Sequence, residues 1–458
     1  MFKKMWSKKA VIPVLASLIA IGCQSSSSVG DDVRAAQTGK TKENHAKIKN
    51  VIVMIGDGMG PAYTTAYRYF KDDPSTPMME ETVFDKYFVG MQKTYPHDEH
   101  ENITDSAAAA TAMSAAVKTY NGAIAVNTDR EPVETVLEQA KKRGKSTGLV
   151  ATSQINHATP AAFAAHNEDR HNYNEIADAY YDDRINGEHK VDVMLGGGTN
   201  YFIREDRNLV KQFKQNGYSY VTTREELLKD DNDQILGLFA PVGLPKAIDR
   251  TKEIPSLEEM TTAAIERLDD NKKGFFLMVE GSQIDWAGHD NDIVGAMSEM
   301  EDFADAVQAA IAYAKKDKHT LVVVTADHST GGLSVGSGYK YVFYPKAIQA
   351  AKITPDFMAE KIASGADVET VLDQYIDFDL SAEEIQSVKK AAATKDDDNE
   401  VHNAIEKIFS ERSHTGWTTT GHTGVDVQVF AYGPGTERFA GMNENTNLAE
   451  QIFNIFKR

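Results

Sequence analysis

Cysteine is almost absent from this sequence, since Cys23 is the only one among 458 residues. An intramolecular disulfide is therefore excluded, and oxidising surroundings add nothing to the stability of the fold. Positive charge is also scarce, because 49 Lys and Arg residues face 68 Asp and Glu residues, leaving a formal net charge of −19. Such a surface repels phosphate backbones, so we expect no nucleic acid binding. Apolar residues make up 41% of the chain, which excludes wholesale disorder.

The N-terminal region has the pattern of an export signal. Four lysines precede a short apolar run over residues 10–21, and Gly22 and Cys23 follow it. A basic start, a short apolar core and small residues are typical of a secretory signal peptide, and the run is too short for a comfortable membrane-spanning helix. We predict a signal peptide over residues 1–22. The Ser/Gly/Thr/Lys-rich composition of residues 23–48 predicts a flexible tether.

Cys23 stands at the predicted cleavage point. Ala20-Ile21-Gly22-Cys23 resembles the cleavage box of bacterial lipoproteins, in which the cysteine becomes the lipidated first residue of the mature chain. We therefore expect a lipid anchor at Cys23 and an exported, periplasmic or cell-envelope lipoprotein. The alternative is an ordinary cleaved signal peptide with an incidental cysteine.

Residues 49–458 alternate short apolar runs with longer helical patterns. Continuous apolar runs of this length predict strands buried on both faces, and they occur at residues 51–55, 147–150, 191–195, 275–279, 321–325 and 427–431. Helical patterns lie between them, at residues 132–143, 204–216, 256–271 and 292–316. This alternation predicts an α/β fold with a mostly parallel central sheet flanked by helices on both faces.

The segment from about 335 to 415 interrupts this alternation. It is charged and in places poor in apolar residues, as in the run over residues 395–400. We predict that it forms a large, mostly helical insertion at one rim of the sheet.

Acidic and imidazole side chains gather after three of the predicted strands. They occur in Gly56-Asp57-Gly58, in Glu280-Gly281-Ser282-Gln283-Ile284-Asp285 and in Asp327-His328. Ligands of open α/β sheets bind beyond the carboxyl ends of the strands, so we expect these segments to converge on one crevice. A single Asp there is more often a helix cap or turn residue. Several carboxylates and imidazoles together indicate zinc or magnesium ligands.

Three histidines are candidate metal ligands, and the sequence around each supports this to a different degree. Asp285 and His289 are one helical turn apart, so they can share a metal ion if a helix follows the strand. Asp327 and His328 are adjacent and reach one ion only if the chain turns, which the following Gly331-Gly332 makes plausible. His422 lies between glycines before a predicted strand, where a loop histidine is the alternative to a ligand.

Ser106 precedes an alanine-rich run that favours a helix. Asp105 or Ser106 could simply cap that helix. The same geometry would also suit a nucleophile, because the unpaired N–H groups and partial positive charge of a helix N-terminus favour a phosphate and the alkoxide form of the serine. The residues alone leave both roles open.

Six sequence blocks, in order, resemble those of the alkaline phosphatases. The blocks are Gly56-Asp57-Gly58-Met59-Gly60, Asp105-Ser106-Ala107-Ala108, His157-Ala158-Thr159-Pro160, Val279-Glu280-Gly281 through His289, Thr325-Ala326-Asp327-His328 and His422-Thr423-Gly424. The resemblance runs from about Lys49 to the C-terminus and is weakest across 335–415. It implies hydrolysis of small phosphate monoesters through a phosphoserine, with two zinc ions and one magnesium ion.

The resemblance also implies roles for individual residues. Ser106 would be the nucleophile, and Arg170 would bind two phosphate oxygens while Asp105 orients it. The implied metal ligands form three groups: Asp57, Asp327 and His328 for the zinc that activates Ser106; Asp285, His289 and His422 for the other zinc; and Asp57, Thr159 and Glu280 for magnesium.

Two positions depart from the best-known bacterial members of that family. His157 stands where some members have an Asp near magnesium, and Trp286 stands where some have a Lys beside the zinc ligand Asp285. This pairing resembles the marine, Vibrio-type branch, and we expect weaker magnesium retention and looser phosphate binding. The long insertion matches branch members in which a large loop reaches over a partner subunit, which implies a homodimer.

Three alternatives remain at this stage. A phosphodiesterase or a sulfatase of the same superfamily would reuse most of the metal ligands. Sulfatases need a modifiable Cys or Ser in a distinctive motif, and the only cysteine lies in the predicted signal region. Diesterases usually lack the arginine, so Arg170 favours monoesters. The third alternative is a metal- or phosphate-binding surface lipoprotein without activity.

Overall fold

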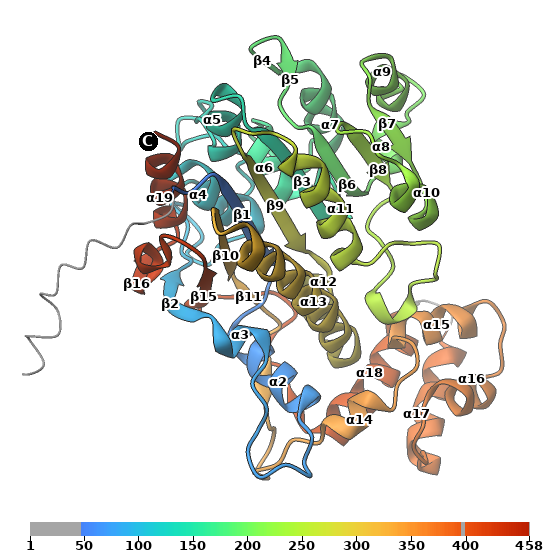
Figure 1. The fold of residues 1–458 in the computed structure, drawn as a ribbon. Helices are drawn as coiled ribbons and strands as arrows, with labels where there is room; N and C mark the ends of the chain where they lie inside the picture. The colour runs from blue at the N-terminus through green and yellow to red at the C-terminus, as the bar shows by residue number, and fades with distance from the viewer. Residues whose placement is uncertain (1–46, 395–398, 458) are drawn as a thin grey trace, which may run out of the picture. The chain divides into compact units, whose positions relative to one another are not determined.

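The computed structural model describes residues 47–394 and 399–457, which build a ten-stranded sheet with helices on both faces (Figure 1). The predicted signal peptide, most of the tether and Cys23 lie outside the described residues. Within the described ranges, no helix combines the length and apolar character needed to cross a bilayer.

The sheet is parallel except at one strand. Its strands follow the order β16 (Gly441–Glu444), β2 (Phe88–Lys93), β15 (Val427–Tyr432), β10 (Thr320–Ala326), β1 (Asn50–Gly56), β9 (Phe275–Gly281), β3 (Ser146–Gln154), β6 (Val193–Gly197), β8 (Ile235–Leu238) and β7 (Ser219–Val221). Only β15 runs antiparallel to its two neighbours. The prediction of a mostly parallel α/β sheet is therefore confirmed.

β1 lies near the middle of the sheet because its side chains are apolar on both faces. Ile52 and Met54 pack into the core under α11 (Leu257–Asp269) and α13 (Ile293–Asp317). Val51, Val53 and Ile55 pack into the core under α4 (Ser106–Ala115), α6 (Ala158–Ala164) and α19 (Thr446–Lys457). All five are fully buried. A continuous apolar run suits a strand that helices cover on both sides.

The helices outside the insertion cover these two faces. They are α2 (Pro61–Lys71), α3 (Val83–Lys86), α4 (Ser106–Ala115), α5 (Val136–Lys142), α6 (Ala158–Ala164), α7 (Tyr173–Asp182), α8 (Thr199–Phe202), α9 (Leu209–Gln215), α10 (Arg224–Lys229), α11 (Leu257–Asp269), α12 (Gln283–His289), α13 (Ile293–Asp317) and α19 (Thr446–Lys457). Two predicted helix starts are wrong. α5 begins after Thr135, which forms a capping box with Glu138, and α9 begins after Asn208, whose side chain accepts from the Lys211 amide.

The segment 335–415, apart from residues 395–398, which are not described, contains five helices. They are α14 (Pro345–Gln349), α15 (Pro355–Ala363), α16 (Val368–Tyr375), α17 (Ala382–Ala393) and α18 (Asn399–Ser413). The antiparallel ribbon of β12 (Ser334–Val335) and β13 (Thr415–Gly416) joins the two ends of the segment. Met358, Ile405 and Phe409 belong to the same core cluster as α13, so these helices share the core of the sheet.

The register of three neighbouring strands brings the chemical motifs together. Gly56 at the end of β1 pairs with Ala326 at the end of β10 and with Gly281 at the end of β9. The three strands are parallel, so the residues that follow them share one edge of the sheet. A second ribbon, β11 (Ser329–Thr330) with β14 (His422–Thr423), brings His422 to the same edge.

Candidate active site

Asp57, Asp327 and His328 form a buried cluster beyond the ends of β1 and β10. His328 Nε2 lies 3.4 Å from Asp57 Oδ1 and 3.2 Å from Asp327 Oδ2. All three residues have 0% exposed surface. The side chains of Asp327 and His328, although adjacent in sequence, thus approach the same point, which requires the chain to turn between them. Gly331 and Gly332, with φ of +73° and +59°, follow after two further residues.

Gly58 makes this close approach possible. Its φ is +70°, and a Cβ atom there would lie 2.7 Å from Thr330 Oγ1 and 2.9 Å from Asp285 Cα. The Gly58 amide donates a hydrogen bond of 3.0 Å to Asp327 Oδ1. A side chain at this position would separate the two clusters of ligands, so the glycine is needed for both its conformation and its size.

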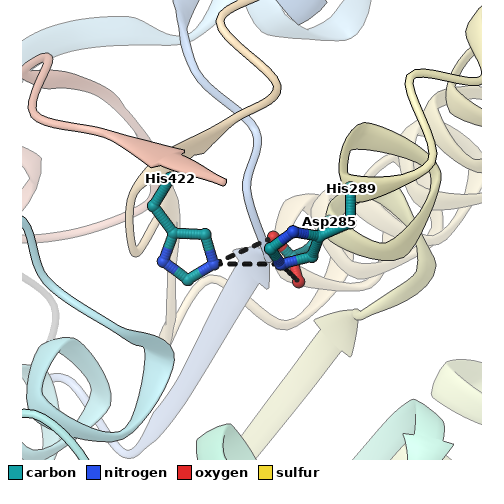
Figure 2. A group of neighbouring side chains, drawn as sticks. All are labelled: Asp285, His289 and His422. Atoms are coloured by element: carbon teal, nitrogen blue, oxygen red, sulfur yellow. Dashed lines mark hydrogen bonds and ion pairs between the residues drawn. The ribbon is translucent and has the colours of Figure 1, made fainter. Parts of the chain in front are cut away.

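Asp285, His289 and His422 form a second cluster (Figure 2). The first two lie one turn apart on α12, with His289 Nε2 3.3 Å from Asp285 Oδ2. His422 Nε2 lies 3.2 Å from His289 Nε2 and 3.5 Å from Asp285 Oδ1. Three potential ligand atoms thus converge from two segments that are distant in the sequence.

Backbone carbonyls orient both imidazole rings of this second cluster. His289 Nδ1 is 2.6 Å from Thr420 O, and His422 Nδ1 is 2.9 Å from Thr104 O. These contacts keep a proton on each Nδ1 and direct the Nε2 lone pairs at Asp285. The hydrogen bond from His289 to Asp285 raises the pKa of His289 to about 9. A proton or a metal ion at His289 Nε2 therefore stabilises the cluster.

A third group surrounds Asp57 on its other side. It contains Asp57, His157 and Glu280, whose ligand atoms lie within 4.8 Å of one another. Thr159, at the start of α6, is also fully buried. The structure thus places His157 beside the site expected for magnesium.

Several polar atoms around Asp57 are buried without a hydrogen-bond partner among the described residues. They are both carboxylate oxygens of Asp57, Glu280 Oε1, Thr159 Oγ1, Asp327 Oδ2 and His157 Nδ1. An unsatisfied buried polar atom costs about 1–3 kcal/mol. Carboxylate and hydroxyl oxygens are ligands that magnesium accepts, and carboxylates with imidazole suit zinc, so the donor set fits divalent cations.

The carboxylates also repel one another. Burial, followed by the charges of Asp327 and Asp285, raises the pKa of Asp57 well above its usual value. Burial likewise raises the pKa of Glu280 to about 7 and that of Asp327 to about 6. Cations between these side chains would remove the repulsion and keep all three ionised.

Ser106 is the first residue of α4, but it does not cap the helix. Asp105 is the N-cap, and its Oδ1 accepts a hydrogen bond of 2.9 Å from the Ala108 amide. Ser106 Oγ instead lies 3.2 Å from His328 Nε2. Its hydroxyl therefore faces the cluster of Asp57, Asp327 and His328 from a helix N-terminus.

Arg170 lies in the loop after α6 and joins two parts of the site. One guanidinium nitrogen donates to Asp105 Oδ2 at 2.9 Å, and the other is 3.3 Å from His157 Nε2. Burial and then the charge of Arg170 lower the pKa of His157 to about 3, so this ring is neutral and accepts from the arginine. Trp286 on α12 meets the His157 ring edge-on, with centroids 5.8 Å apart.

Thr330 on β11 connects the two histidine clusters, a contact that the sequence did not predict. Its hydroxyl donates a short hydrogen bond to Asp285 Oδ1 and lies 3.3 Å from His328 Nδ1. The hydroxyl has one proton to donate, so it accepts from Nδ1–H of His328 and leaves Nε2 free for the cluster. The sequence shows only that Thr330 follows the Asp327-His328 motif, and no spacing rule identifies it.

Comparison with known proteins identifies relatives over the whole described fold. The alkaline phosphatase family profile matches residues 48–458. Alkaline phosphatase 3 of Bacillus subtilis is 60% identical over 454 residues, covering 98% of this chain and 97% of that protein. The crystal structure of a cold-active alkaline phosphatase from a psychrophilic Shewanella species has 45% identity and a TM-score of 0.84, covering 89% of this chain and all of that chain.

A further solved relative contains a bound metal ion. It is a His-to-Glu variant of the TAB5 alkaline phosphatase with Mg bound in its M3 site. This relative has 31% identity and a TM-score of 0.67, and the match covers 90% of this chain and 99% of that chain. With the serine, the arginine and three groups of potential metal ligands at one edge of the sheet, the chain is an enzyme that belongs to the alkaline phosphatase family.

Proposed function

We propose that this enzyme hydrolyses phosphate monoesters through a covalent phosphoserine at Ser106. The observation that carries the proposal is the position of the Ser106 hydroxyl, 3.2 Å from His328 Nε2 at the N-terminus of α4. Asp105 already caps the helix, so the hydroxyl is available for chemistry. A helix N-terminus beside Arg170 is an anion site suited to a phosphoryl group.

We assign the cations as two zinc ions and one magnesium ion. Asp57, Asp327 and His328 would hold one zinc, Asp285, His289 and His422 the other, and Asp57, Thr159 and Glu280 the magnesium. When bound, such cations supply Lewis-acid stabilisation of the charge that develops on the reacting oxygens. The Mg found in the TAB5 variant with a substituted histidine supports a magnesium role near His157.

The residues of the chain divide the work of the first step. Ser106 Oγ attacks phosphorus, the bond from phosphorus to the alcohol oxygen breaks, and the alcohol leaves with a proton. Arg170 binds two non-bridging phosphate oxygens, and Asp105 holds its guanidinium in place. The N–H groups at the start of α4 stabilise the added negative charge.

Water completes the reaction in a second displacement. It attacks the phosphoserine at phosphorus, the bond from phosphorus to Ser106 Oγ breaks, and inorganic phosphate leaves while the hydroxyl regains its proton. Arg170 keeps the phosphoryl group in one orientation through both steps. Each displacement inverts phosphorus, so the two together retain its configuration.

Trapping the intermediate tests this function. Acid quenching during turnover of a phosphorus-labelled aryl phosphate is expected to leave label on the peptide that contains Ser106, and Ser106→Ala should carry none. A chiral, isotopically labelled ester should give retention at phosphorus. Net inversion, or unchanged turnover in Ser106→Ala, would overturn the proposal.

Arg170 favours phosphate monoesters over diesters. A monoester dianion offers enough non-bridging oxygens for both guanidinium nitrogens and the helix N-terminus. A diester has one non-bridging oxygen fewer, because its second ester group occupies it. Rates on an aryl phosphate, an aryl diester and an aryl sulfate, measured side by side, separate the three activities. A higher rate on the diester or the sulfate would contradict the monoester assignment.

We also propose an exported, lipid-anchored homodimer. Residues 1–23 support export and lipidation, as argued from their sequence. The homodimer is supported by exposed large apolar side chains, among them Met78 with 78% exposed surface and the fully exposed Tyr339 and Tyr341. Sedimentation of the chain without residues 1–22 tests the dimer, and a monomer at micromolar concentration would exclude it.

A further inference from the structure

α12 has two faces with separate tasks. Asp285 and His289, four residues apart, face the site, while Gln283, Trp286 and the C-cap residue Asp290 lie toward another side of the helix. Each of the three contacts the loop over residues 240–246, which follows β8. The loop therefore runs along the face of α12 that carries no ligand.

The contacts of this loop are specific at both ends of α12. Gln283 Nε2 donates to Leu244 O at 2.6 Å near the start of the helix. Lys246 Nζ donates to Asp290 Oδ2 at 3.0 Å just beyond its end. Between them the Trp286 ring packs on Gly243, where a Cβ would lie 2.6 Å from the ring.

The helical segment 335–415 reaches the C-terminal end of α12. Lys246 Nζ also donates to Asp356 Oδ2 on α15, at 2.6 Å. Asp356 Oδ1 pairs with His402 Nδ1 on α18 at 2.7 Å, and His402 Nε2 lies 3.4 Å from the backbone carbonyl of Asp290. α15 and α18 lie near the N-terminal end of α13, which follows α12 (Figure 1).

Lys246 and His402 are buried cations, so each depends on the acceptors that surround it. The side chains of Lys246 and His402 are only 10% and 9% exposed, so their charges need partners. Asp356 serves both of them, and Asp290 offers its carboxylate to one and its carbonyl to the other. Positive charge is also favourable at the C-terminal end of a helix, where the last carbonyls are unpaired.

We infer that Lys246, Asp356 and His402, here named the α12 clamp, are positioning residues for the metal ligand His289. The clamp holds Asp290, the residue directly after His289, and thereby fixes the end of the helix that presents the imidazole. The insertion is then part of the support of the active site and not only a surface addition. This inference rests on the proposed zinc site of Asp285, His289 and His422.

Zinc affinity of the full chain tests the clamp without relying on turnover. Asp356→Asn and His402→Gln are each expected to weaken zinc binding about tenfold, the lower end of the effect of removing residues that orient metal ligands. Asp377→Asn is the matched control, because it breaks the Asp377–Lys352 pair in the same insertion away from α12. Competition with a chelator measures all three variants against the unmodified chain.

A double-mutant cycle separates positioning from a general loss of stability. In a His289→Ala background the clamp variants should have no further effect on zinc affinity. In the chain that keeps His289, Asp356→Glu should retain most of the zinc affinity that Asp356→Asn loses. His402→Gln removes the other partner of the Asp356–His402 pair and gives a second, independent measurement beside Asp356→Asn. Unchanged zinc affinity in both variants, or an equal loss with and without His289, would overturn the inference.

The outcomes also distinguish this inference from the proposed function. An unmodified chain that binds zinc but forms no phosphoserine contradicts the proposed function. A chain that forms the phosphoserine and binds zinc equally well with and without the clamp contradicts only the inference.

Discussion

Asp105 connects the helix that carries Ser106 to Arg170 through a single carboxylate. Its Oδ1 accepts from the Ala108 amide at 2.9 Å, and its Oδ2 accepts from the Arg170 guanidinium at 2.9 Å. The Gly122 amide donates to the same Oδ2 at 3.0 Å. One side chain thus sets the separation between the proposed nucleophile and the cation that would bind the phosphoryl oxygens.

Arg170→Lys is expected to lower kcat/KM for an aryl phosphate by about 10- to 100-fold. The single nitrogen of an ammonium group cannot donate two parallel hydrogen bonds to phosphate while it also binds Asp105. Steady-state kinetics checks this. Arg130→Lys is the control, since Arg130 forms an exposed pair with Glu168 and is 65% exposed. An equal loss in both variants would contradict a specific role for Arg170.

Thr330→Val is expected to weaken zinc binding by about 10-fold, because it removes the hydroxyl that contacts both Asp285 and His328. Thr330→Ser keeps the hydroxyl and should retain affinity close to that of the unmodified chain. Chelator competition measures both variants. Equal affinities for the valine and serine variants would show that the contact with the threonine hydroxyl does not support the ligands.

His157→Asp is expected to strengthen magnesium retention, because magnesium binds a carboxylate oxygen better than the nitrogen of a neutral imidazole. Metal analysis after dialysis checks this. His171→Asp is the control, since His171 is 72% exposed and forms an ion pair with Asp169. Equal magnesium content in His157→Asp and the unmodified chain would contradict the expectation.

Trp286→Lys is expected to tighten inhibition by inorganic phosphate, because it adds a cation next to Asp285 on α12. The inhibition constant of phosphate, measured for both forms at one ionic strength, checks this. An unchanged constant would count against looser phosphate binding in the chain as it stands. The assignment to the marine, Vibrio-type branch stays a prediction.

His402 predicts a stability that falls with rising pH. Burial alone would lower the pKa of His402, but its hydrogen bond and charge interaction with Asp356 raise it to about 9, above the usual 6.5. Asp290 and Asp292 add to this effect, whereas the nearby Lys246 opposes it. A raised pKa means that the folded chain binds the proton more tightly, so this stabilisation is complete below pH 6.5 and is lost as pH rises through 9.

The metal-free chain and its His402→Gln variant provide the measurement. The unmodified chain should be more stable by about 2 kcal/mol near pH 6, as for a hydrogen bond to a charged group. That difference should shrink between pH 7 and 10. Glu406, whose pKa burial raises to about 8, titrates in the same range and interacts with His402, so the comparison is repeated in a Glu406→Gln background. A difference that is constant with pH would contradict the assignment of charge to His402.

Much of the fold follows from the local sequence. The buried strands at the centre of the sheet are uniformly apolar, so the runs that become β1, β9 and β10 were predictable. The edge strand β16 and its neighbour β2 were not, because β2 buries only Gly90 and Gln92 and β16 buries none of its residues. β7 and β8 were missed because they are only three and four residues long.

The site divides in a similar way. Ligand-type residues at the ends of parallel strands could be grouped from sequence, because strand ends meet at one edge of the sheet. The roles of Thr330 and Lys246 could not, since their partners Asp285 and Asp356 are 45 and 110 positions away. Only the folded chain decides which hydroxyl or ammonium group meets a given carboxylate.

The clusters of potential ligands join parts of the chain that are far apart. Asp327 accepts from Gly58, 269 positions away, and His422 contacts the carbonyl of Thr104, 318 positions away. A cation shared across such distances would act as a reversible cross-link that closes very long loops, in a chain whose single cysteine cannot form an internal one. Resistance to heat would then depend on the free metal concentration around the enzyme, because a ligand that binds only the folded chain stabilises it by mass action.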